Sequence, residues 1–94
     1  MAIETTVYDS ADYLDSPEAI AAYIDAAFED GEPALITHAL GVVARAKGMS
    51  QLARDAGVTR EALYKALTAD GDPKLSTFVG VLKALGMRLS ARAA

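Results

Sequence analysis

Residues 49–68 read MSQLARDAGVTREALYKALT, and this stretch decides the fold. Two short helices that cross steeply need a small residue where they touch, a glycine in the turn and apolar anchors on both helices. Ala53 fits the first position and Gly57 the second, and the expected anchors are Leu52, Val58, Leu63 and Leu67. The sequence therefore predicts a helix-turn-helix. A helix-turn-helix can bind DNA, but a glycine between alanine-rich helices also occurs in bundles that bind no DNA. The pattern alone therefore does not decide whether the protein binds DNA.

The second helix of this stretch is expected to place its N-terminal side chains in the major groove of DNA. In such a recognition helix, Arg60 can bond guanine in a bidentate manner and Thr59 can touch a thymine methyl group. Glu61 can accept from cytosine or orient Arg60. The alternative is that the charged side chains are only solvated. The candidate base-contacting residues are Thr59, Arg60, Glu61, Tyr64, Lys65 and Thr68.

The preceding helix is expected to approach the phosphate backbone. Ser50 and Gln51 lie at its start, where free N–H groups and the helix dipole favour a phosphate, and Ser50 is its expected N-cap. Lys74 follows the motif and is a further phosphate candidate. Arg45, Lys47 and Arg54 also flank the motif and can add to its salt-sensitive affinity.

The charges divide between an acidic first half and a basic second half. Residues 1–43 hold nine acids and no Lys or Arg, a charge of −9, whereas residues 44–94 hold nine Lys and Arg and four acids, +5. Together they give the net charge of −4. Such asymmetry indicates two surfaces with different partners, of which only the second attracts phosphate.

Caps and breakers predict three further helices, at about 17–30, 33–47 and 73–85. Ser16 is the expected N-cap of the first helix, and Thr59 that of the recognition helix. Asp72 before Pro73 is the expected start of the last helix. Residues 87–92 then alternate between apolar and polar, which permits a short C-terminal strand without indicating its pairing partner. We expect an irregular segment at 1–15 and a single helical DNA-binding domain at 16–94.

Composition supports an all-α protein of one domain. The 94 residues are 52% apolar, with alanine supplying much of that share and aromatic residues only 6%, which suits close helix packing. The absence of cysteine excludes disulfides and thiolate sites. The N-terminus lacks the pattern of a signal peptide and no stretch is apolar enough for a membrane span, so we expect a cytoplasmic protein with no membrane partner.

Nearly the whole chain, from Tyr8 to Ser90, resembles a known bacterial family. The segments that carry the resemblance are YDSADYLDSPEAIAAYIDAAFEDGEPA, EPALITHALGVVARAKG, MSQLARDAGVTREALYKAL and DGDPKLSTFVGVLKALGMRLS. They are similar to the probable addiction-module antidote family, within the Cro/C1-type (XRE-like) helix-turn-helix superfamily. The implied fold is a five-helix, lambda repressor-like helix-turn-helix domain with an extra N-terminal amphipathic helix.

The resemblance implies the antitoxin of a type II toxin–antitoxin module. Its partner would be a small basic toxin of RelE/ParE-like type, and as a homodimer it would repress its own operon at a palindromic operator. The charge of −9 on residues 1–43 is compatible with a basic partner protein. The first helix then offers toxin-contact candidates, unless its aromatic residues are core and its acids merely solvated: Tyr23, Asp25, Phe28, Glu29 and Asp30. The alternatives are a stand-alone Cro/C1-type repressor and an interaction module without DNA binding.

The residues point to no enzyme, metal or cofactor. His38 is the single histidine and has no cysteine to join it in a metal site. The serines lack a glycine-flanked elbow, and the glycines form no phosphate-binding loop. We therefore expect a protein that acts by binding.

Overall fold

The computed structural model describes residues 14–68 and 70–94, and within these residues the chain forms helices and no strand. The all-α prediction is confirmed. The C-terminal strand that the alternation permitted is not formed, because residues 87–94 have no strand beside them within the described part of the chain. The helices are α2 (Pro17–Asp30), α3 (Pro33–Lys47), α4 (Met49–Ala56), α5 (Arg60–Ala66) and α6 (Leu75–Ala84).

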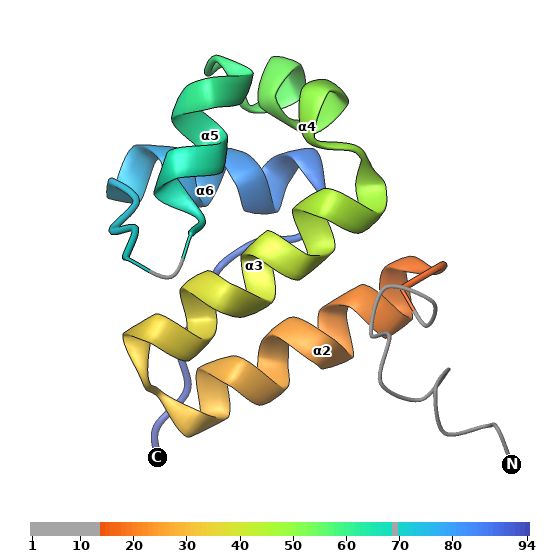
Figure 1. Cartoon of the computed structure of the whole chain (residues 1–94). Coiled ribbons are helices and arrows are strands. Elements are labelled where there is room, and N and C mark those ends of the chain that lie inside the picture. Colours follow the sequence, from red (N-terminus) through yellow and green to blue (C-terminus); the bar gives the residue numbers. More distant parts are fainter. Residues whose placement is uncertain (1–13, 69) are drawn as a thin grey trace, which may run out of the picture.

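The helices lie on both sides of α3. α2 and α3 run antiparallel, α4 and α5 lie on the far side of α3 from α2 (Figure 1), and α6 also packs against α2. Gly31 makes the first reversal possible, because it ends α2 with a φ of 82°, a conformation that favours glycine. None of the helices in residues 14–68 and 70–94 is long and apolar enough to cross a bilayer.

A single core joins all five helices. Ile20 and Ile24 from α2 belong to the same buried cluster as residues of the other four helices. Leu14, in the segment expected to be irregular, lies outside any helix but is also buried in this cluster. Residues 1–13 of that segment lie outside the described residues. The largest fully buried side chains are Leu40, Val43, Leu63, Val81 and Leu82.

Local capping chemistry places some helix ends as expected and others not. Ser16 Oγ accepts from the Ala19 N–H at 3.1 Å, which confirms it as the N-cap of α2. Ser50 is not a cap, because Gly48 is the N-cap of α4 and the helix begins at Met49, two residues earlier than a cap at Ser50 would give. α6 begins at Leu75, later than Asp72 and Pro73 suggested, and no side chain caps it.

α3 is held very close to the end of α5. A Cβ atom on Gly41 would lie 2.8 Å from the carbonyl oxygen of Leu67. Backbone cannot move aside as a flexible side chain can, so only glycine permits this approach. Gly80 of α6 is similarly close to α4, with a Cβ position 3.2 Å from the Ala56 carbonyl oxygen. These two contacts fix α5 and α4 against the rest of the protein.

Candidate functional site

A tight turn joins α4 to α5, and we call residues 49–66 the α4–α5 unit. Gly57 ends α4 with a φ of 78°, and its N–H donates to the Arg54 carbonyl at 3.2 Å. The Val58 N–H donates to the Ala53 carbonyl at 3.0 Å. These two bonds satisfy carbonyls at the end of α4, as is usual where a left-handed glycine reverses the chain. The turn therefore has the geometry that Gly57 predicted.

One residue anchors the short helix α5 in the core. Leu63 is completely buried, and it is the only buried residue of α5. Leu67, directly after the helix, is also buried. Because both face inward, the outer side of α5 is fixed toward solvent.

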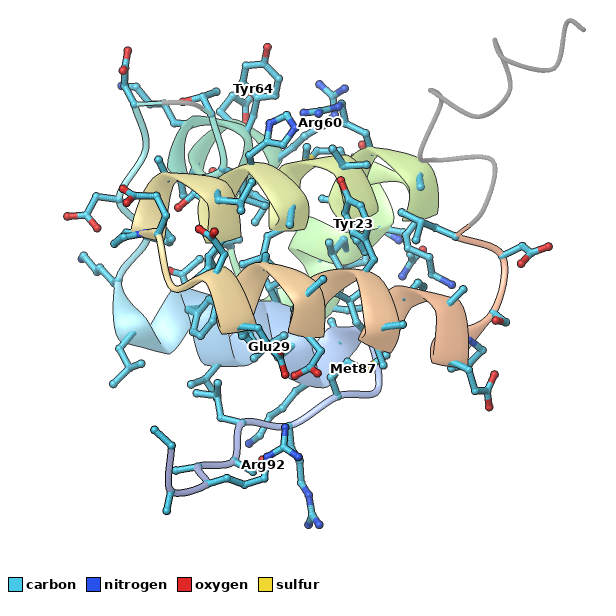
Figure 2. The ribbon with its side chains drawn as sticks, turned by 90° about the horizontal axis from the view of Figure 1, so that it is seen from below. Tyr23, Glu29, Arg60, Tyr64, Met87 and Arg92 are labelled. Atoms are coloured by element: carbon cyan, nitrogen blue, oxygen red, sulfur yellow. The ribbon has the colours of Figure 1, made fainter. Side chains whose placement is uncertain are left out.

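The candidate base-contacting side chains of α5 lie on that outer side. Arg60, Glu61 and Lys65 are exposed, and Tyr64 is 55% exposed although it is a large apolar residue. Arg60 and Tyr64 both project from the same edge of the molecule (Figure 2). The structure thus brings these candidates together on one face, where a flat partner could reach them all.

Two threonines of the candidate set have structural contacts. Thr59 Oγ1 accepts from the Ala62 N–H at 3.0 Å and so caps α5, as predicted. Thr68 is half-buried beyond the end of the helix, and its hydroxyl donates to the Lys65 carbonyl at 2.9 Å. α5 ends at Ala66, which is earlier than the sequence suggested. Thr68 therefore lies outside α5.

The phosphate candidates are exposed, but one of them is tied to its own helix. Gln51 donates to Asp55 Oδ1 at 2.9 Å and accepts from Arg54 at 2.8 Å. The amide nitrogen of Gln51 has a second hydrogen, so a phosphate contact by Gln51 would not have to replace either of these bonds. Ser50, in the first turn of α4, and Lys74, directly before α6, are exposed.

The toxin-contact candidates fall into two groups. Asp25, Glu29 and Asp30 are exposed on α2. Tyr23 and Phe28 are half-buried and pack against the core. The ring of Phe28 meets that of Phe78 edge to face, with centroids 6.1 Å apart and an interplanar angle of 67°, a favourable aromatic geometry. Phe28 therefore links α2 to α6.

A groove of about 680 Å³ runs between α2 and the C-terminal tail. Asp25 and Glu29 line it from α2, and Arg88 and Arg92 line it from the tail. Glu29, Met87 and Arg92 lie on the side of the molecule away from Arg60 and Tyr64 (Figure 2). Sequence reasoning missed this groove, because no local pattern indicated that the tail returns to α2.

The described residues hold no group of three His, Asp or Glu side chains placed to bind a metal ion. His38 is exposed on α3. The candidate site consists of two surfaces: the acidic outer side of α2, and the outer side of the α4–α5 unit, which exposes three basic and two acidic side chains, Arg54, Arg60 and Lys65 against Asp55 and Glu61.

These features define a small all-helical protein with an acidic helix on one side and an exposed short helix on the other. The chain belongs to the family of probable addiction module antidote proteins, whose model matches residues 4–93. An antidote of this kind implies a toxin as its partner.

A relative from Haemophilus influenzae, described as an uncharacterized protein, is 46% identical over 81 residues. The match covers 86% of this chain and 84% of the relative, so the similarity extends through both halves of the molecule. No solved structure matches the chain.

Proposed function

We propose that the protein is the antitoxin of a type II toxin–antitoxin module with two activities. It neutralises a small basic toxin of RelE/ParE-like type by direct binding, and it represses its own operon through a Cro/C1-type helix-turn-helix. Both activities are binding events, and no catalytic step is required. Family membership supports the antidote role. The exposed side chains of α2 and of α5 form two separate surfaces, which supports one surface for the toxin and one for DNA.

The observation that carries the DNA-binding half is the orientation of α5. Leu63 is fully buried, whereas Arg60, Tyr64 and Lys65 are exposed on the opposite side. A helix held in this way can enter the major groove with its N-terminal end first. As a homodimer, the protein would meet two half-sites of a palindromic operator about one helical turn apart.

The toxin-binding half rests on the charge of α2. Glu18, Asp25, Glu29 and Asp30 are exposed, and α2 contains no Lys or Arg. A basic partner would be attracted to this side, with fast association that weakens as salt rises. Tyr23 and Phe28 pack against the core, so the proposed contact depends mainly on the carboxylates.

The toxin half is tested by co-expression with the small basic protein encoded in the adjoining reading frame. We expect the two proteins to co-purify at moderate salt and to separate more readily at high salt. The variant Glu29→Lys should weaken the complex, and Lys65→Glu on the opposite side should not. The antitoxin role should be abandoned if no complex forms at moderate salt.

The DNA half is tested with the promoter fragment of the same operon. We expect Arg60→Ala to cost about 1–3 kcal/mol of operator binding and to relax the base preference, as loss of a bidentate contact does. Lys65→Ala should lower affinity more evenly across sequences if it contacts phosphate. Glu18→Ala, on α2, is the control. If both α5 variants bind the operator as the wild type does, α5 does not enter the major groove.

The two tests also separate the alternatives. Operator binding without toxin capture would indicate a stand-alone repressor. Toxin capture without operator binding would indicate an interaction module that keeps the fold and has no DNA-binding activity.

A further inference from the structure

The C-terminal tail, residues 88–94, returns along α2 from an anchored start. Gly86 turns the chain at the end of α6 with a φ of 79°, and the Met87 N–H donates to the Leu82 carbonyl at 2.8 Å. Beyond Met87, no backbone–backbone hydrogen bond within the described part of the chain reaches the tail, and all of the tail residues are exposed. The tail can therefore leave α2 without breaking a backbone hydrogen bond or opening the core.

The groove between α2 and the tail has walls of opposite charge, and we call it the α2–tail groove. Asp25 and Glu29 line it from α2, and Arg88 and Arg92 line it from the tail. Glu29 and Arg92 lie on the same side of the molecule (Figure 2). All four side chains are exposed, so water and salt weaken the attraction between the two walls. The tail is thus attracted to α2 but not fixed on it.

The α2–tail groove also has an apolar floor. Ile24 and Leu82 are buried beneath it, and half-buried Phe28 also lines it. A surface with carboxylates beside apolar side chains fits a segment that carries arginine or lysine together with apolar residues. The tail, RLSARAA, has this composition and contains no acid. The tail therefore shows the chemistry of the segment that this groove accepts.

We propose that the α2–tail groove is the surface that binds the toxin, and that the tail occupies it in the free protein as a substitute for a basic segment of the toxin. Toxin binding displaces the tail. This inference rests on the antitoxin role of the proposed function and deepens it, because it assigns toxin binding to one groove and gives the free protein a means of regulating it. The carboxylates of α2 favour a basic segment, and the antidote family implies a toxin as the partner that supplies it.

Competition from the tail lowers the affinity for the toxin. Because the tail belongs to the same chain, its effective concentration at the groove is high although each of its contacts is weak. The toxin binds only the fraction of molecules in which the tail has left, so its apparent affinity falls by that fraction. A toxin that covers more of α2 than the tail does still displaces it, whereas a short basic segment of another protein does not.

Removal of the charge of the tail tests this competition in the full-length chain. The double variant Arg88→Gln/Arg92→Gln loses the attraction to Asp25 and Glu29, so fewer molecules hold the groove closed. It should bind the toxin about three- to tenfold more tightly than the wild type. Titration with the purified toxin from the adjoining reading frame, at moderate salt, measures the two Kd values.

The control must match the change in net charge, because the loss of two positive charges by itself attracts a basic partner. Lys74→Gln/Lys83→Gln removes the same charge from exposed residues that do not line the groove. This control should change the toxin Kd by less than about twofold. If the arginine double variant binds the toxin no more tightly than the lysine control, the proposal is overturned. Weaker binding by the arginine variant would mean that the tail itself contacts the toxin, which also overturns it.

The mobility of the tail tests its contact with α2 in the absence of toxin. In the free wild type, NMR backbone order parameters of residues 88–92 should stay above about 0.6, and in Asp25→Asn/Glu29→Gln they should fall below that value. Addition of toxin to the wild type should cause the same fall. A tail that stays ordered in the variant or in the complex would contradict the proposal. A tail that loses order on dilution would lie on a second copy of the chain, which would contradict it as well.

The two measurements distinguish failure of this inference from failure of the proposed function. If the toxin binds but the arginine double variant gains nothing over the lysine control, the competition by the tail is wrong and the antitoxin role stands. If no toxin binds while Asp25→Asn/Glu29→Gln still releases the tail, the contact between tail and α2 stands, and the proposed function fails together with the assignment of the groove to a toxin.

Discussion

α2 and α5 lie on opposite sides of the molecule and are held in place by different contacts. α2 is fourteen residues long, is capped at both ends by Ser16 and Gly31, and buries residues along its length. α5 has seven residues and a single buried anchor, Leu63. The outer charges of α2 can therefore change with little effect on the fold, whereas α5 depends on very few contacts.

The largest effect is expected at the anchor of α5. Leu63→Ala removes a fully buried side chain and should cost about 2–5 kcal/mol of unfolding free energy, through lost burial and the cavity left behind. Leu35→Ala, at a site 41% exposed, should cost much less. Urea unfolding of the two variants measures the difference. Equal losses would show that α5 is not held by Leu63.

The next effect is expected where α3 approaches the end of α5. Gly41→Ala places a Cβ atom 2.8 Å from the Leu67 carbonyl oxygen, so the backbone must shift, at a cost of about 1–3 kcal/mol. Gly80→Ala is the comparison, because its Cβ position is 3.2 Å from the nearest backbone oxygen. Thermal unfolding should rank Gly41→Ala as the more damaging. The reverse order would contradict the close contact at α5.

A smaller effect is expected at the two helix caps. Thr59→Ala removes the bond to the Ala62 N–H and should cost about 1 kcal/mol, as should Ser16→Ala in α2. Thr59→Ser keeps the hydroxyl and should be nearly neutral. Only Thr59→Ala should also weaken operator binding, since Thr59 caps α5 whereas Ser16 caps α2. Equal loss of operator affinity in both alanine variants would contradict the proposal that operator binding depends on α5 and not on α2.

The smallest effect is expected for charge reversals on the two outer faces. Glu29→Lys and Lys65→Glu alter exposed side chains, and each should change the unfolding free energy by no more than about 0.5 kcal/mol. Chemical denaturation checks this. A larger loss in either variant would mean that the charge takes part in holding the fold.

Features set by neighbouring residues could be predicted from the sequence. The Ser16 and Thr59 caps and the glycine at position 57 each depend on a few consecutive residues, and the structure contains all three. The prediction that Ser50 is a cap is wrong, because Gly48 caps α4 and the helix begins two residues earlier than a cap at Ser50 would give. Sequence patterns compete at helix starts, and tertiary packing decides between them.

Features that depend on distant residues could not be predicted. Phe28 and Phe78 lie in contact although 50 positions separate them in the sequence. The apolar spacing of α2 indicated a buried face but did not indicate which helix covers it. The groove between α2 and residues 87–92 was missed for the same reason, because it depends on where the tail returns.

The proposed function gives one small chain two independent binding surfaces. The most direct test measures the affinity of Glu29→Lys and Lys65→Glu for both the toxin and the operator, by titration under the same salt conditions. We predict that Glu29→Lys weakens only toxin binding and that Lys65→Glu weakens only operator binding. Parallel loss of both affinities in either variant, with the fold intact, would contradict the account.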